Sequence, residues 1–132
     1  MHTTNYFDTF IAIAKDCPVT AAEVPLVRDP KSAAQIQYEM LAGHPYEYTS
    51  DDALYISNGE RRGQRREAFF AKGQPCFRSS PLIKRYGWGV HSNAEGKIAL
   101  YPVGSEEYQR LAADSSLTQL QGMRSTRPVR TK

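Results

Sequence analysis

The chain has 132 residues, which suits one domain of ordinary size and is too short for two. Its hydrophobic fraction of 40% and charged fraction of 23% fall in the range of folded globular proteins. No apolar run approaches the roughly 20 residues of a membrane span, so we expect no transmembrane helix and no membrane partner.

The formal net charge of +3 is unevenly distributed along the chain. All 14 acidic residues lie at or before Asp114, and 13 of the 17 Lys and Arg residues share that segment, so 1–114 carries a net charge of −1. Segment 115–132 holds the other four basic residues and no acid. We therefore predict a single domain over 1–114, followed by a basic, flexible tail over 115–132. Because the basic excess belongs to the tail, nucleic-acid binding is expected to be weak at most.

The cysteine and histidine content argues against disulfides and metal sites. The two cysteines, Cys17 and Cys76, cannot form a disulfide framework or, alone, a zinc site. The three histidines have no partner at metal-ligand spacing, and nucleotide-binding and hydrolase signatures are absent. The first six residues lack the features of a signal peptide. These observations predict a cytoplasmic protein with reduced thiols, no cofactor and no metal.

The first half of the chain indicates a strand and a helix. Residues 6–14 place apolar side chains on both faces of an extended chain, which is typical of an interior strand covered on two sides. A helix is predicted over 33–41, with Ser32 as its N-cap and Gln35 in capping-box spacing. Its expected buried stripe is Ala33, Ile36 and Met40, flanked by Leu41.

Three elements are predicted in the middle of the chain. Residues 46–52 resemble a loop, 53–56 a short strand, and 60–72 a helix that ends at Gly73. The arginines of this helix continue its aromatic stripe at spacings of four residues, so they do not occupy the opposite face.

A hairpin and a last helix follow. A turn over 94–96, with Gly96 in the left-handed conformation, pairs Ser92 with Ile98. This register collects four apolar side chains on one face: Trp88, Val90, Ile98 and Leu100. Ser105 is the expected cap of a final helix, with an inward stripe of Tyr108, Leu111 and Ala112. We therefore predict an α+β fold, a small and mostly antiparallel sheet with packed helices.

Residues 73–91 hold the densest group of candidate site residues. Ser80 and Pro81 have the pattern of a helix entry, whose free N–H groups favour an anion beside Arg78, Lys84 and Arg85. The alternative is that these cations pair with acids of the domain. Trp88, between two glycines, either stacks on a ligand or anchors the core. His91 is either a base or an ordinary surface residue.

Cys76 is the candidate nucleophile in the same segment. Nearby cations would favour its thiolate, and His91 would serve as its base. The alternative is that Cys76 is a small buried hydrophobe that follows a loop proline.

Two runs in this segment carry a resemblance. Gly-Gln-Pro-Cys at 73–76 and Lys-Arg-Tyr-Gly-Trp-Gly at 84–89, together with 49–52 and the hairpin 91–97, resemble a family of small uncharacterised microbial proteins, a domain of unknown function. The resemblance covers roughly residues 3–112. It implies no activity, substrate or cofactor.

Three function classes follow from these residues. The leading one is a non-catalytic domain that binds a ligand, a small anionic molecule or a protein, through the 73–91 surface. The alternative is a small cysteine-dependent enzyme that uses Cys76. The third is a nucleic-acid accessory protein that uses the tail and four arginines: Arg61, Arg62, Arg65 and Arg66. A homodimer is compatible with all three.

Overall fold

A five-stranded sheet with the order β2-β4-β3-β1-β5 organises the protein. The computed structural model describes residues 3–125. The strands are β1 (Thr9–Ala12), β2 (Tyr48–Thr49), β3 (Trp88–Ser92), β4 (Lys97–Pro102) and β5 (Thr118–Gln121). All neighbouring pairs are antiparallel except β1 and β5, which run parallel. This mostly antiparallel sheet with packed helices confirms the predicted α+β class.

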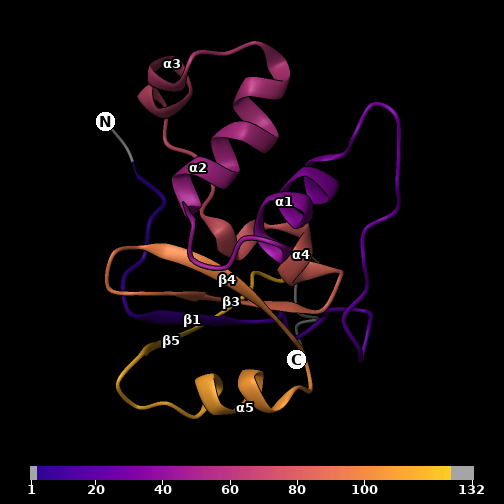
Figure 1. The fold of residues 1–132 in the computed structure, drawn as a ribbon, viewed down its shortest axis with the longest axis vertical. Helices are drawn as coiled ribbons and strands as arrows, with labels where there is room; N and C mark the ends of the chain where they lie inside the picture. Colours follow the sequence, from indigo (N-terminus) through magenta and orange to yellow (C-terminus); the bar gives the residue numbers. More distant parts are fainter. Residues whose placement is uncertain (1–2, 126–132) are drawn as a thin grey trace, which may run out of the picture.

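Helices cover both faces of the sheet (Figure 1). They are α1 (Ala33–Ala42), α2 (Ser50–Leu54), α3 (Arg66–Ala71), α4 (Pro81–Lys84) and α5 (Glu106–Ala112). Three short turns of helix supplement them: η1 (Tyr55–Gly59), η2 (Glu60–Arg62) and η3 (Phe77–Ser79). No helix in the described part of the chain is long and apolar enough to cross a membrane.

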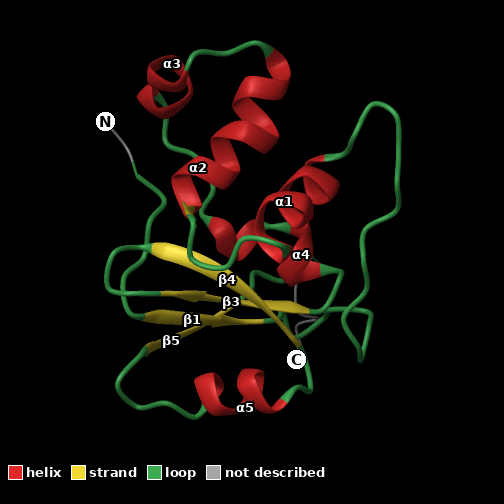
Figure 2. Ribbon diagram, in the orientation of Figure 1, coloured by secondary structure: helices red, strands yellow, loops and turns green. Residues whose placement is uncertain are grey.

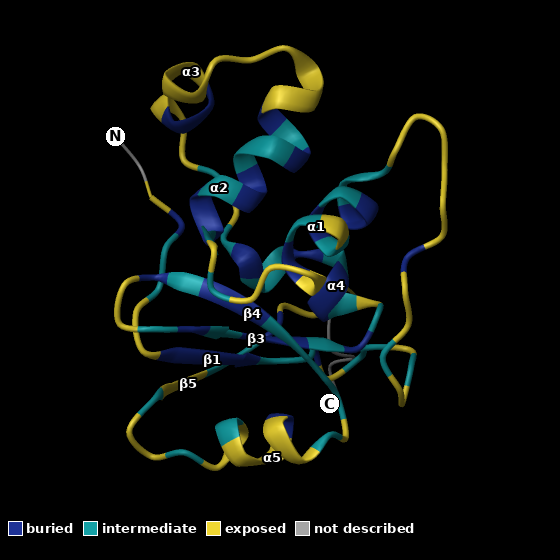
Figure 3. Cartoon of the chain, viewed as in Figure 1, coloured by how far each residue is buried: buried dark blue, intermediate teal, exposed yellow. Residues whose placement is uncertain are grey.

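The β3–β4 hairpin has the predicted register. Ser92 pairs with Ile98 and Val90 with Leu100, and Gly96 adopts a φ of +80°. Because only one register collects the apolar side chains on one face, the hydrophobic pattern sets the pairing. That face meets α1 and its neighbours to form the main core, which Figure 3 shows as buried.

Strand β1 lies inside the sheet and is covered on both faces, as predicted. Ile11 belongs to the main core. Phe10 points to the other face, where its ring meets Tyr108 of α5 edge-on at a centroid distance of 5.1 Å. Figure 2 shows α5 alone on this side of the strands.

The cap of α1 was predicted correctly, but its buried face was not. Ser32 Oγ accepts a hydrogen bond from the Gln35 backbone N–H at 3.1 Å. Leu41 is buried as expected, whereas the other buried residues are Ala34, Gln35 and Gln37. In α5 likewise, Ser105 is the cap and Tyr108 is buried, but Ala112 is exposed. In α1, the hydrogen-bonded Gln35 and Gln37 occupy the buried face in place of part of the apolar stripe.

The predicted strand over 53–56 is wrong. These residues belong to α2 and η1, and α2 starts with a capping box in which Thr49 and Asp52 exchange side-chain-to-backbone hydrogen bonds. The predicted helix over 60–72 is divided into η2 and α3, because Gly63 with a φ of +75° ends the first turn.

Residues 118–121, which the sequence placed in a flexible tail, form β5 beside β1. Leu120 packs against the main core, and Gly122 is buried. Residues 126–132, the last part of the expected tail, lie outside the described residues.

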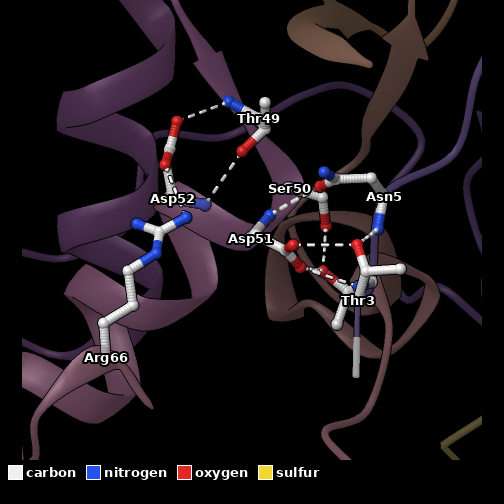
Figure 4. A network of polar contacts seen from close by, with 8 residues as sticks. Thr3, Asn5, Thr49, Ser50, Asp51, Asp52 and Arg66 are labelled. Atoms are coloured by element: carbon white, nitrogen blue, oxygen red, sulfur yellow. Dashed lines mark hydrogen bonds and ion pairs between the residues drawn. The ribbon is translucent and has the colours of Figure 1, made fainter. Parts of the chain in front are cut away.

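The N-terminal segment is fastened to α2 by a polar network (Figure 4). The Asp51 carboxylate accepts hydrogen bonds from the Thr3 hydroxyl at 2.8 Å and from the Thr4 backbone and hydroxyl at 2.7 Å each. Asn5 in turn accepts the Asp51 N–H at 2.9 Å. These bonds account for the buried carboxylate, so the network has a structural role.

Candidate functional site

A cavity of about 370 Å³ opens where α1, η1, α3 and segment 74–81 meet. Its walls are lined by Ala33, Gln37, Leu54, Asn58, Arg62, Phe69, Gln74, Pro75, Cys76, Ser79, Ser80 and Pro81. The first cavity, as we call it, therefore combines apolar walls with amide and hydroxyl groups, which is the usual make-up of a small-molecule site.

Cys76 lies half-buried in the wall of the first cavity. Its Sγ accepts a hydrogen bond from the Tyr6 hydroxyl at 3.2 Å. Burial, together with this bond, raises the pKa of Tyr6 to about 12, so the phenol stays a donor at neutral pH. Among the described lining residues there is no histidine and no carboxylate. None of these described lining residues is thus a base for Cys76.

Ser80 caps α4 as predicted, but its hydroxyl serves the core and offers no open anion site. Its Oγ donates to Gln37 Oε1 at 2.6 Å and accepts from the Leu82 N–H at 3.2 Å. Gln37 Nε2 donates onward to Ser57 Oγ at 3.0 Å. This buried chain joins α1, η1 and α4 and fixes the floor of the first cavity.

Lys84 and Arg85 line a second cavity, whose wall includes the start of α1. Arg28, from the loop before α1, completes a group of three cations there. The remaining lining residues are Ser32, Ala33, Ala34, Ser79, Pro81 and Tyr86. Both cavities share Ala33, Ser79 and Pro81, so they adjoin each other.

Arg78 is separated from Lys84 and Arg85, with which it was grouped. Its Nε donates to the Gln121 carbonyl at 2.6 Å, which ties η3 to the end of β5. Arg78 also lines a third cavity, beside Lys15 and Arg124. The predicted anion-binding group is therefore divided between two surfaces.

Trp88 has a packing partner and a hydrogen bond of its own. Its ring lies 5.5 Å from that of Tyr38 on α1, and its Nε1 donates to the Glu23 carbonyl at 2.8 Å. These contacts hold the long loop between β1 and α1 against β3. Trp88 lines none of the three cavities described above.

His91 belongs to the face of the sheet opposite Val90 and the main core. Its Nδ1 lies 2.7 Å from the Tyr46 hydroxyl, which lies 2.7 Å from the Tyr101 hydroxyl. Burial lowers the pKa of His91, while Asp8 and Asp114 act in the opposite direction. Cys76, Arg78 and His91 thus do not line a common cavity.

Sequence reasoning missed several wall residues because they come from separate elements. Arg28 precedes α1, Gln37 lies within it, and Asn58 belongs to η1. None of them has a local motif. The one available signal in the sequence was the pair of glutamines at 35 and 37. In the structure both are buried in α1, and Gln37 is hydrogen-bonded to Ser57.

Nearly the whole sequence matches a family model, and this finding replaces the resemblance. The chain belongs to the family of unknown function DUF6157, which it matches over residues 1–128. The match thus continues past residue 112, where the resemblance was expected to stop. Comparisons with curated proteins and with solved structures gave no match. Within the described residues, no group of three or more His, Cys, Asp or Glu side chains is placed to hold a metal ion.

Proposed function

We propose that the protein is a non-catalytic binding domain for a small organic anion whose uncharged part occupies the first cavity. The observation that carries this proposal is the chemistry of the cavity wall. Leu54, Phe69 and two prolines supply apolar surface, and no acid–base pair accompanies Cys76 among the described lining residues. Binding without catalysis fits such a wall better than nucleophilic chemistry, which needs a base.

Two amide carbonyls at the wall have unused hydrogen-bonding capacity. Asn58 and Gln74 each donate a hydrogen bond through the side-chain nitrogen, to Ser57 Oγ at 3.3 Å and to the Phe69 carbonyl at 2.6 Å. Within the described residues, no group donates to Asn58 Oδ1 or Gln74 Oε1. A ligand for this cavity should therefore present N–H or O–H donors beside its apolar part.

The test is a thermal-shift screen of small organic molecules on the full chain, with hits measured by calorimetry. The variant Asn58→Leu keeps the side-chain volume and removes the amide. A ligand in the first cavity should bind this variant about tenfold more weakly, because one hydrogen bond to a desolvated group is lost. The matched control is Gln109→Leu on the exposed face of α5, which should leave the affinity unchanged.

A separate measurement tests the alternative that the protein is a cysteine-dependent enzyme. Rapid alkylation of Cys76 at pH 7 in a Cys17→Ala background would indicate a reactive thiolate and overturn the binding proposal. Equal affinities of hits for Asn58→Leu and the unsubstituted chain would also overturn it.

A further inference from the structure

The second cavity is a basic pocket whose charges are not compensated. Arg28, Lys84 and Arg85 reach it from two segments that are far apart in the sequence. Within residues 3–125, none of the three forms an ion pair; the pairs found there involve Lys31, His44 and Arg66. Three unpaired cations on one concave surface concentrate positive potential.

The pocket is built on backbone that hydrogen bonds hold in place. The Arg28 N–H donates to Gln35 Oε1 at 3.0 Å, which fixes the loop against α1. The Arg85 N–H donates to the Pro81 carbonyl at 2.8 Å, at the end of α4. Both arginines are therefore presented from fixed positions, and little backbone ordering is left for a ligand to induce.

We infer that this pocket binds the phosphate group of a small organic phosphate, an inference that rests on the proposed function for the uncharged part of the ligand. The two cavities share three wall residues, and on this inference one ligand of modest size spans both. Two guanidinium groups and one ammonium supply many N–H donors. They match the three free oxygens and the double charge of a phosphate monoester better than the two oxygens of a carboxylate.

The experiment is an NMR titration of the ¹⁵N-labelled full chain with inorganic phosphate at constant ionic strength. Saturable shifts should appear at the amides of residues 33–34 and 84–86. The double variant Lys84→Met/Arg85→Met should bind phosphate at least tenfold more weakly. The control Lys97→Met/Arg110→Met removes the same charge from β4 and α5 and should stay within twofold of the unsubstituted chain. Native-like spectra of both variants establish that they fold.

Three outcomes would overturn the inference. They are shifts that do not saturate, equal losses in the two double variants, and acetate binding as tightly as phosphate. The probe tests the pocket without the first cavity. Saturable phosphate binding with no hit in the organic screen would therefore remove the proposed function and retain the pocket. Organic hits without saturable phosphate binding would remove only the phosphate inference.

Discussion

Tyr46 is hydrogen-bonded through both its backbone and its hydroxyl, on the face of the sheet opposite the main core. Its backbone has a φ of +60°, a left-handed conformation that bulky residues rarely adopt. Its N–H donates to the Ile98 carbonyl at 2.9 Å, and its hydroxyl lies between His91 and Tyr101. Burial and the Tyr101 hydroxyl raise the pKa of the Tyr46 phenol, so the phenol keeps its proton for hydrogen bonding with these neighbours. The strained backbone is thus offset by three hydrogen bonds.

We predict that this arrangement makes stability depend on pH through His91. Burial holds the pKa of His91 below its ordinary value of 6.5, despite Asp8 and Asp114. The unfolded chain therefore takes up the proton at higher pH than the folded chain does. The free energy of unfolding should be undiminished above pH 6.5 and should fall as the pH is lowered through the depressed pKa. Urea denaturation at several pH values measures this decline, which should be smaller in His91→Gln. Equal declines would contradict the prediction.

The candidate site was predictable only where one short segment supplies it. Cys76, Ser80, Lys84 and Arg85 stand out because glycine, proline and basic residues accumulate around them. Their division between two cavities depends on where α1 lies, since residues of its first turn line both of them. Arg28 enters through a loop whose position is set by Gln35. Such long-range contacts leave no trace in local spacing.

At the scale of elements, capping and turn signals in the sequence were sufficient to predict the structure where they act locally. Ser32, Ser105 and Gly96 each fix their element through neighbours within four residues. The short apolar run at 53–56 is compatible with either helix or strand. The capping box at Thr49 and Asp52 decides for helix, and it was the signal that sequence reasoning overlooked.

Strand β5 was missed because its identity depends on a distant partner. Three of its four residues are polar, so no apolar alternation indicates a strand. Its register comes from β1, more than 100 residues earlier, through bonds such as Gly122 N–H to the Ala12 carbonyl at 2.8 Å.

We predict that Gly122→Ala destabilises the protein, because the end of β5 is packed. A Cβ at this position would lie 2.3 Å from a methyl carbon of Ile83 and 3.0 Å from the Ala14 nitrogen. Such overpacking costs about 1–3 kcal/mol, which lowers the Tm by roughly 4–10 °C in a chain of this size. The control is Gly43→Ala, where a Cβ meets nothing within 4 Å. Calorimetry compares the two, and equal Tm values would show that β5 is not packed in solution.

At the scale of the whole molecule, the two ends of the described chain are fastened by different means. The N-terminal segment is bonded to α2 through Asp51, and β5 extends the sheet beside β1. The Ser125 N–H also donates to the Asp16 carboxylate at 2.9 Å. The structure therefore continues well beyond Asp114, after which the sequence holds only basic charge.

Charge also bears on the nucleic-acid hypothesis, for which we predict weak and strongly salt-dependent binding. Of the four arginines proposed for that role, Arg61 donates to the Lys31 carbonyl and Arg66 pairs with Asp52 at 2.9 Å, so two are already engaged. Segment 1–114 carries a net charge of −1, so much of any affinity should come from residues 126–132 with their three basic side chains.

Fluorescence anisotropy with a labelled DNA duplex at 50, 100 and 200 mM salt measures this dependence. Truncation after Ser125 should reduce the slope of log K against log salt by up to about 2.7, since each phosphate contact contributes roughly 0.9. The double variant Lys97→Met/Arg110→Met removes two cations of the folded part and should change the slope less. Sequence-specific binding by the truncated chain at 200 mM salt would contradict the prediction and favour a nucleic-acid partner, because it would require base contacts from the folded part.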